Sequence, residues 1–265
     1  MAILFAEKPG LVVYLTAGDP SLAATCEIAI AAIDAGAAVI ELGVPFSDPL
    51  ADGPVIQRAS ERAVARGTRL KDVLQIAKEI RAARPAAGLV IFSYFNPILR
   101  YGLAKFADDA AACGADGVLV TDMIVEEAAE YLAEMARVNL APIFLAAPTS
   151  SDERLQAIAT HSKGFVYAIS RTGITGKQQS LTADAESLVA RIRRFSNQGG
   201  TTLSIAVGFG ISNSEHFAQV GSFADAAVVG SAIVELIERS TPEDAPGAVA
   251  RFIKGLRQPE AALTR

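Results

Sequence analysis

The amino-acid sequence predicts a single-domain α/β protein, residues 1–265, with the fold of a closed (β/α)8 TIM barrel. Short apolar runs rich in β-forming residues alternate with longer segments of helical period along the whole chain. The runs are nearly continuous in apolar residues, which is typical of parallel strands covered by helices. A doubly wound open sheet is the structural alternative. It is disfavoured because no Gly-x-Gly-x-x-Gly turn follows the first run.

Eight runs are predicted to be strands, and they make eight βα units without a reversal. They span residues 11–16, 39–42, 89–94, 117–121, 142–146, 165–169, 203–207 and 227–229. Helices are predicted where apolar residues recur at intervals of three and four. Such segments include residues 22–35, 69–83, 104–112 and 126–138. The pieces Gly36-Ala37 and Gly114-Ala115-Asp116-Gly117 are interpreted as tight helix-to-strand turns at the bottom of the barrel.

Composition excludes several classes of function. The chain is 51% hydrophobic with a net charge of −5, and its basic residues are scattered, so we expect an ordered core and no nucleic-acid binding. No signal peptide and no apolar run long enough for a bilayer is visible, so the chain is expected to be cytoplasmic, without a membrane segment. The isolated Cys26 and Cys113 are interpreted as small core residues.

The stretch 41–54, after the second predicted strand, is the leading site candidate, because active sites of such barrels lie at the carboxyl ends of the strands. Glu41 falls in an apolar strand, where a charged carboxylate is costly unless it is paired or used. The alternative is a glutamate satisfied by a neighbouring hydroxyl or amide. The loop is longer than a connection requires, and we expect Asp52 to face the same cavity as Glu41. Asp48 is expected to have a structural role as a cap or turn residue.

Other catalytic groups are poorly placed. Lys163 precedes a strand and Lys177 lies well out in a loop, so neither suits Schiff-base chemistry. His161 and His216 are too few and too far from strand ends for a metal site, and none is predicted. General acid–base chemistry by carboxylates and tyrosines remains. The strand-end candidates are Glu41, Asp52, Tyr14, Tyr94 and Tyr167.

Two glycine-containing segments, 208–212 and 230–234, follow the seventh and eighth predicted strands, the position of the phosphate site in many such barrels. Gly210 and Gly230 would let backbone N–H groups approach the phosphate. Ser231 would add its hydroxyl and open a short helix whose N-terminus favours an anion. The sequence therefore predicts a phosphate-binding mouth.

After the sixth predicted strand, the segment 170–177 is polar and hinged by glycines, and irregular chain is expected to continue to about Asp184. That length suits a lid over the barrel mouth. Gly176 is a candidate backbone donor to the phosphate when the lid closes.

Several motifs together resemble the α subunit of tryptophan synthase, from about residue 10 to 255. The stretch 41–54 is similar to the signature loop of that family. The other family-like segments are 16–20, 94–97, 172–176, 208–212 and 230–234. The resemblance implies a lyase of the last stage of tryptophan biosynthesis, which reversibly cleaves indole-3-glycerol phosphate into indole and glyceraldehyde 3-phosphate.

The same resemblance implies roles for individual residues. Glu41 would shuttle protons to indole C3 and the glycerol hydroxyl, and Asp52 would hold the indole N–H and stabilise the positive indolenine. Tyr167 resembles an active-site tyrosine of the family. The lid would include Arg171 and Thr175, with Thr175 contacting Asp52 on closure. The indole pocket would be lined by Phe209, Tyr14 and Phe92.

A partner is also implied: a tryptophan synthase β subunit in an α2β2 assembly, which receives indole through a tunnel. No cofactor is expected in this chain, because pyridoxal phosphate would belong to that partner. Pro49, Asn96 and Asp122 resemble residues that contact it. Ile124 stands where the family usually has proline, which loosens a turn near this surface. The short start leaves little room for a helix before the first strand, so a less closed barrel bottom is expected.

Two other functions remain open on the sequence alone. One is an autonomous lyase that releases indole without a partner. The other is a non-enzymatic phosphate-binding barrel, which would leave the intact carboxylates and lid unexplained.

Overall fold

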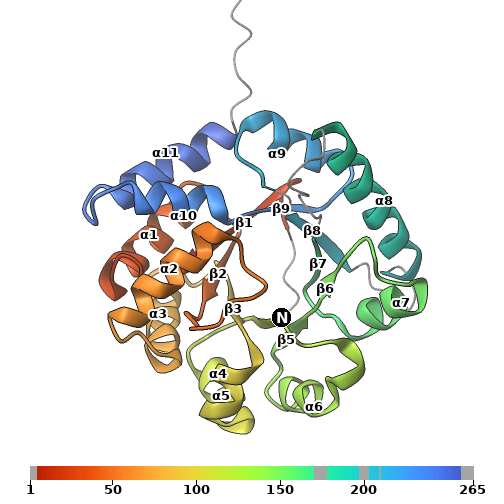
Figure 1. Cartoon of the computed structure of the whole chain (residues 1–265), viewed down its shortest axis with the longest axis horizontal. Coiled ribbons are helices and arrows are strands. Elements are labelled where there is room, and N and C mark those ends of the chain that lie inside the picture. The colour runs from red at the N-terminus through yellow and green to blue at the C-terminus, as the bar shows by residue number, and fades with distance from the viewer. Residues whose placement is uncertain (1–4, 170–177, 197–202, 209, 258–265) are drawn as a thin grey trace, which may run out of the picture.

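The computed structural model describes residues 5–169, 178–196, 203–208 and 210–257 and has parallel strands in a ring surrounded by helices (Figure 1). All strand pairs are parallel, in the order β5-β4-β3-β2-β1-β9-β8-β7-β6. The strands are β1 (Gly10–Thr16), β2 (Val39–Gly43), β3 (Gly88–Ser93), β4 (Gly117–Val120), β5 (Ala141–Ile143), β6 (Leu145–Ala146), β7 (Phe165–Ile169), β8 (Ser204–Gly208) and β9 (Ala226–Val229). The predicted barrel class is confirmed.

One predicted strand, residues 142–146, is wrong as a single element. Its first half, β5, pairs with β4, and its second half, β6, pairs with β7. The strand divides at Phe144 because the segment changes its pairing partner there. Lys163 N donates to Pro142 O at 2.8 Å and Tyr167 N donates to Phe144 O at 3.0 Å. These bonds nearly close the ring.

The helices follow the strands around the outside of the barrel (Figure 1). They are α1 (Leu22–Asp34), α2 (Pro54–Ala65), α3 (Leu70–Ala83), α4 (Phe95–Tyr101), α5 (Leu103–Ala112), α6 (Ala129–Arg137), α7 (Asp152–His161), α8 (Gln178–Ser196), α9 (Ser214–Gly221), α10 (Ser231–Glu238) and α11 (Ala245–Arg257), with a 3-10 turn η1 (Val125–Glu127). Within the described ranges, no helix is long and apolar enough to cross a membrane.

Two helix boundaries differ from the prediction. Irregular chain does not continue to Asp184, because α8 begins at Gln178. The predicted helix 126–138 is divided into η1 and α6. The tighter 3-10 turn eclipses side chains three residues apart, which places Val125 and Ala128 together in the core.

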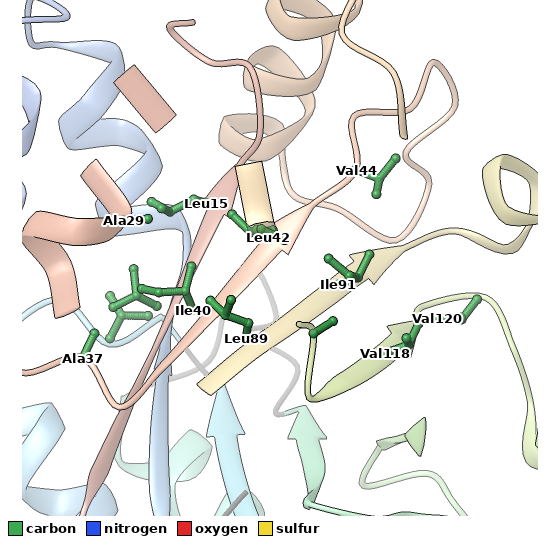
Figure 2. Close-up of a cluster of buried hydrophobic side chains, with 14 of the residues drawn as sticks. Leu15, Ala29, Ala37, Ile40, Leu42, Val44, Leu89, Ile91, Val118 and Val120 are labelled. Atoms are coloured by element: carbon green, nitrogen blue, oxygen red, sulfur yellow. The ribbon is translucent and has the colours of Figure 1, made fainter. Parts of the chain in front are cut away.

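Strand side chains alternate between the barrel interior and the surrounding helices. Figure 2 shows side chains of the outward set, such as Leu15, Ile40 and Leu89, in the layer between strands and helices. The inward set forms a separate cluster inside the barrel, with Val12, Val39, Val90, Leu119, Ile143, Phe165 and Ala206 among its members. Glu41 is two residues after the inward Val39, so the same alternation points it into the barrel.

The lower end of the barrel tests several smaller expectations, and not all of them agree with the structure. Gly36 (φ +113°) and Gly114 (φ +84°) have positive φ values at helix-to-strand turns, as predicted. Among described residues 5–9 no helix precedes β1, but Phe5 packs against Phe165 with ring centroids 6.0 Å apart. A side chain therefore closes the end that was expected to be more open. Of the two cysteines predicted to be core residues, Cys113 is buried, whereas Cys26 is only partly buried against the core.

Candidate active site

Glu41 lies on β2 in register with Tyr14 on β1 and Val90 on β3. Its side chain is in the barrel interior and the residue is only 1% exposed. Neither carboxylate oxygen has a hydrogen-bond partner among the described residues. In the part of the chain that the structure describes, therefore, no neighbouring hydroxyl or amide satisfies this glutamate. Burial raises the pKa of Glu41 to about 8, so its carboxyl group is mainly protonated at neutral pH.

The raised pKa of Glu41 makes folding stability depend on pH. The unfolded chain releases this proton above its ordinary pKa of 4.5, whereas the folded protein holds it until about pH 8. The folded state therefore binds more protons in that window, and stability falls as pH rises through it. At pH 7 the loss is on the order of 3 kcal/mol. We expect Glu41→Gln, which cannot ionise, to be more stable than the wild type by a margin of that order at pH 7.

Urea unfolding of wild type and Glu41→Gln at a series of pH values measures this margin. The margin should be small near pH 4.5 and grow until about pH 8. A margin that stays constant across this range would show that Glu41 does not have a raised pKa in the folded protein.

Asp52 lies in the loop between β2 and α2, two residues before α2 begins. Tyr94 Oη donates to Asp52 Oδ2 at 2.9 Å and accepts from Ala51 N, also at 2.9 Å. Burial raises the pKa of Asp52 to about 6, and the hydrogen bond from Tyr94 opposes that rise. The Asp52 carboxylate is therefore charged at neutral pH, whereas Glu41 is mainly neutral.

The loop that carries Asp52 is held at its other end by Ser60 on α2. Ser60 Oγ accepts from Phe46 N at 2.9 Å and donates to Phe46 O at 3.2 Å. Asp48 accepts a hydrogen bond from Ser47 Oγ at 2.5 Å and is exposed, which agrees with its predicted turn role. Asp48 and Asp52 belong to the same loop, but Asp48 is exposed whereas Asp52 is partly buried and bound to Tyr94.

Two inward tyrosines lie near the carboxylates and depend on glycines opposite them. A Cβ at Gly43 would lie 2.2 Å from Tyr14 Oη, and one at Gly208 would lie 2.6 Å from Tyr167 Oη. Only glycine therefore leaves room for these rings. Burial, together with the nearby carboxylates, raises the pKa of both tyrosines. Both stay protonated at neutral pH and suit hydrogen-bond donation rather than the role of a general base.

These groups line one cavity of about 420 Å³ at the carboxyl ends of the strands. The predicted site residues on its wall are Glu41, Asp52, Tyr14, Phe92, Tyr167, Gly210, Gly230 and Ser231. The rings of Tyr14 and Phe92 meet edge to face, with centroids 5.0 Å apart. Gly230 precedes the first residue of α10, Ser231, as the sequence predicts for a helix N-terminus beside an anion site.

Sequence reasoning missed some groups of this wall. Thr121 and Leu145 also line the cavity. Their signal was the two-residue alternation, since Thr121 continues the inward series of Gly117 and Leu119. Tyr94 was a candidate for acid–base chemistry, but its bond to Asp52 depends on a loop conformation that the sequence does not reveal. Within the ranges described by the structure, no three His, Cys, Asp or Glu side chains are grouped to hold a metal ion.

The remaining predicted residues lie elsewhere. Arg171, Thr175, Gly176 and Phe209 fall outside the described residues. The predicted partner contacts follow the carboxyl ends of β2, β3 and β4, with Pro49 and Asp122 on loops and Asn96 in α4, and they do not line the cavity. They are the partly exposed Pro49 and the exposed Asn96 and Asp122. Asp122 Oδ1 accepts from Phe95 N at 2.7 Å, which joins the loop after β4 to the first residue of α4.

Known proteins resemble this chain along nearly its whole length. The family profile described as tryptophan synthase alpha chain matches residues 2–262. The tryptophan synthase alpha chain of Solibacter usitatus is 51% identical over 233 residues, covering 88% of this chain and 85% of that protein. The corresponding chain of Geobacter sulfurreducens is 47% identical over 251 residues, covering 95% and 93%. Tryptophan synthase subunit alpha of Legionella pneumophila has a similar crystal structure, with a TM-score of 0.84 at 35% identity, covering 95% and 92%.

Proposed function

Since this chain belongs to the tryptophan synthase alpha chain family, it is a lyase that cleaves indole-3-glycerol phosphate, and we propose that Glu41 and Asp52 perform the cleavage. The observation that carries this assignment is the burial of Glu41 without a hydrogen-bond partner among the described residues, at the wall of the cavity. A buried polar group without a partner is costly, and a substrate that pairs with it would explain why it is there.

The protonation states suggest an order of events. Glu41, neutral at working pH, gives its proton to indole C3, which leaves a positive charge on the ring that extends to the nitrogen. The ionised Asp52 accepts a hydrogen bond from the indole N–H and stabilises that charge. Glu41, now a carboxylate, takes the proton of the hydroxyl next to the ring. The carbon–carbon bond then breaks, its electrons return to the indole ring, and an aldehyde leaves.

The other site residues support binding. Tyr14 and Phe92 provide apolar walls for the indole, and Tyr167 donates a hydrogen bond to the substrate or to Glu41. The phosphate is bound by backbone N–H groups near Gly210 and Gly230 and by the Ser231 hydroxyl. Phe209, Gly176, Arg171 and Thr175 are proposed, from the family resemblance alone, to complete the indole pocket, the phosphate site and the lid.

The loop after β2, the helix α4 after β3 and the loop after β4 are proposed to bind a β subunit in an α2β2 assembly. Each presents a large apolar side chain to solvent: Leu50 is 91% exposed, Leu99 58% and Ile124 43%. Isolated exposed residues are ordinary, but three on segments that follow neighbouring strands suggest an interface. Pro49 and Leu50 also line a depression of about 850 Å³ beside α2. Pyridoxal phosphate would be held by that partner, and the assembly would be cytoplasmic, with this chain as a single domain.

The test is indole release from indole-3-glycerol phosphate by the isolated chain and by the chain with a β subunit. The value of kcat/KM should rise through about pH 6 as Asp52 ionises and fall through about pH 8 as Glu41 loses its proton. Adding the β subunit should accelerate release. If the isolated chain is already fast and the β subunit changes nothing, the autonomous lyase is correct instead. No indole in either case would contradict the assignment of the site.

A further inference from the structure

Four charged side chains near the barrel mouth form a continuous ionic network, which we call the Arg62 network: Asp19, Arg58, Arg62 and Glu238. Arg62 binds Asp19 with two bonds, Nε to Oδ1 at 2.9 Å and Nη2 to Oδ2 at 2.6 Å. Its third nitrogen, Nη1, donates to Glu238 Oε1 at 2.6 Å. Arg58 binds the same Glu238 with two bonds, of 2.9 and 2.7 Å. The two arginines on α2 thus connect this helix to the loop after β1, which carries Asp19, and to α10, which carries Glu238.

The connected segments begin or end beside the substrate cavity. Arg58 and Arg62 are on α2, which begins two residues after Asp52. Glu238 is the last residue of α10, whose first residue is Ser231 at the cavity wall. Figure 1 shows α2 beside α10 on one side of the barrel, and residues of the two helices are in contact. The Arg62 network therefore connects the helix next to the indole-binding carboxylate with the helix next to the phosphate site.

Apolar contact alone would fix the relative position of these helices poorly. Their buried apolar contact comprises Ala59 on α2 and Val234 on α10, packed with Tyr14, and Val55 and Ile56 of α2 are partly buried against this cluster. Such contact is not directional, whereas paired bonds between a guanidinium and a carboxylate fix both distance and angle. Hydrogen bonds from Arg58 and Arg62 lower the pKa of Glu238 to about 2, so Glu238 stays charged at the pH values where the enzyme works.

We propose that the Arg62 network sets the distance between the two ends of the substrate site, so that indole and phosphate can be bound at once by one molecule. Its members are positioning residues, since none of them lines the cavity. The inference rests on the proposed function of that cavity. It concerns only ligands that span both ends: a ligand that occupies one end does not need the spacing.

The test compares three ligands by calorimetry on the full chain: indole, glycerol 3-phosphate, and 3-(indol-3-yl)propyl phosphate. The last spans both ends but lacks the hydroxyls needed for cleavage. Glu238→Ala removes the link from α10 to both arginines, and it should keep the fold because Glu238 is at the surface end of a helix. We expect its affinity for the spanning ligand to fall about tenfold while both one-ended affinities stay within about twofold. Glu238→Gln should be intermediate.

Arg81→Gln is the matched control. Arg81 on α3 belongs to a separate ion pair, with Asp116 at 2.7 Å, before β4 at the opposite end of the barrel, and glutamine keeps a donor for the backbone carbonyls that Arg81 contacts. It should leave all three affinities unchanged. Equal affinities of Glu238→Ala and wild type for the spanning ligand, or a parallel loss for all three ligands, would overturn the role of the network. If the wild-type protein binds 3-(indol-3-yl)propyl phosphate no more tightly than it binds indole or glycerol 3-phosphate, the proposed function is overturned instead.

Discussion

Glu41→Gln is expected to lower the turnover of indole-3-glycerol phosphate by at least about a hundredfold, the usual contribution of a general acid–base group. Glutamine has the shape of protonated glutamate, so the substrate pocket keeps its form. The amide can neither give a proton to indole C3 nor take one from the glycerol hydroxyl. Because the carboxyl group has no hydrogen-bond partner among the described residues, the substitution breaks no hydrogen bond to any of them.

Initial rates of indole release at saturating substrate measure this loss. The higher stability expected of Glu41→Gln at pH 7 distinguishes loss of chemistry from unfolding, because the two effects have opposite signs. Glu79→Gln, the same exchange at an exposed position of α3, is the control and should leave the rate unchanged. Near-normal turnover in Glu41→Gln would contradict the mechanism.

Much of this site could be predicted from the sequence because strand periodicity is local information. Alternation along a strand is enough to place Tyr14 and Glu41 on the same inward side, and the barrel then brings them to one mouth. Glycine positions were also informative. Gly210 and Gly230 were assigned to the phosphate end, and both line the cavity.

What the sequence could not reveal depends on side chains far apart in the chain. Glu41 has no hydrogen-bond partner among the residues that the structure describes, and this is visible only when its neighbours are placed in space. The bond between Tyr94 and Asp52 joins residues 42 positions apart, and Arg62 meets Glu238 across 176 positions. The division of the strand at Phe144 has the same cause, because pairing partners are set by the closed ring rather than by local propensity.

Asp52→Asn is expected to lower turnover by at least about a hundredfold, for an electrostatic reason. The asparagine oxygen still accepts a hydrogen bond from Tyr94 or from the indole N–H. It carries no negative charge, however, and in a partly buried cavity that charge stabilises the positive indolenine more strongly than it would in water. The loss should therefore appear mainly in kcat rather than in KM.

The pH profile tells whether Asp52 acts through its charge. In wild type, kcat/KM should fall below about pH 6 as Asp52 gains a proton, and this acid limb should disappear in Asp52→Asn. The substrate phosphate also titrates near this pH, and an acid limb that persists unchanged in Asp52→Asn would belong to the phosphate.

Tyr94→Phe provides the complementary test. Because the hydrogen bond from Tyr94 lowers the pKa of Asp52, its removal should move the acid limb to higher pH while turnover at pH 8 changes little. Turnover of Asp52→Asn close to that of the wild type would show that the cleavage does not need a negative charge at this position.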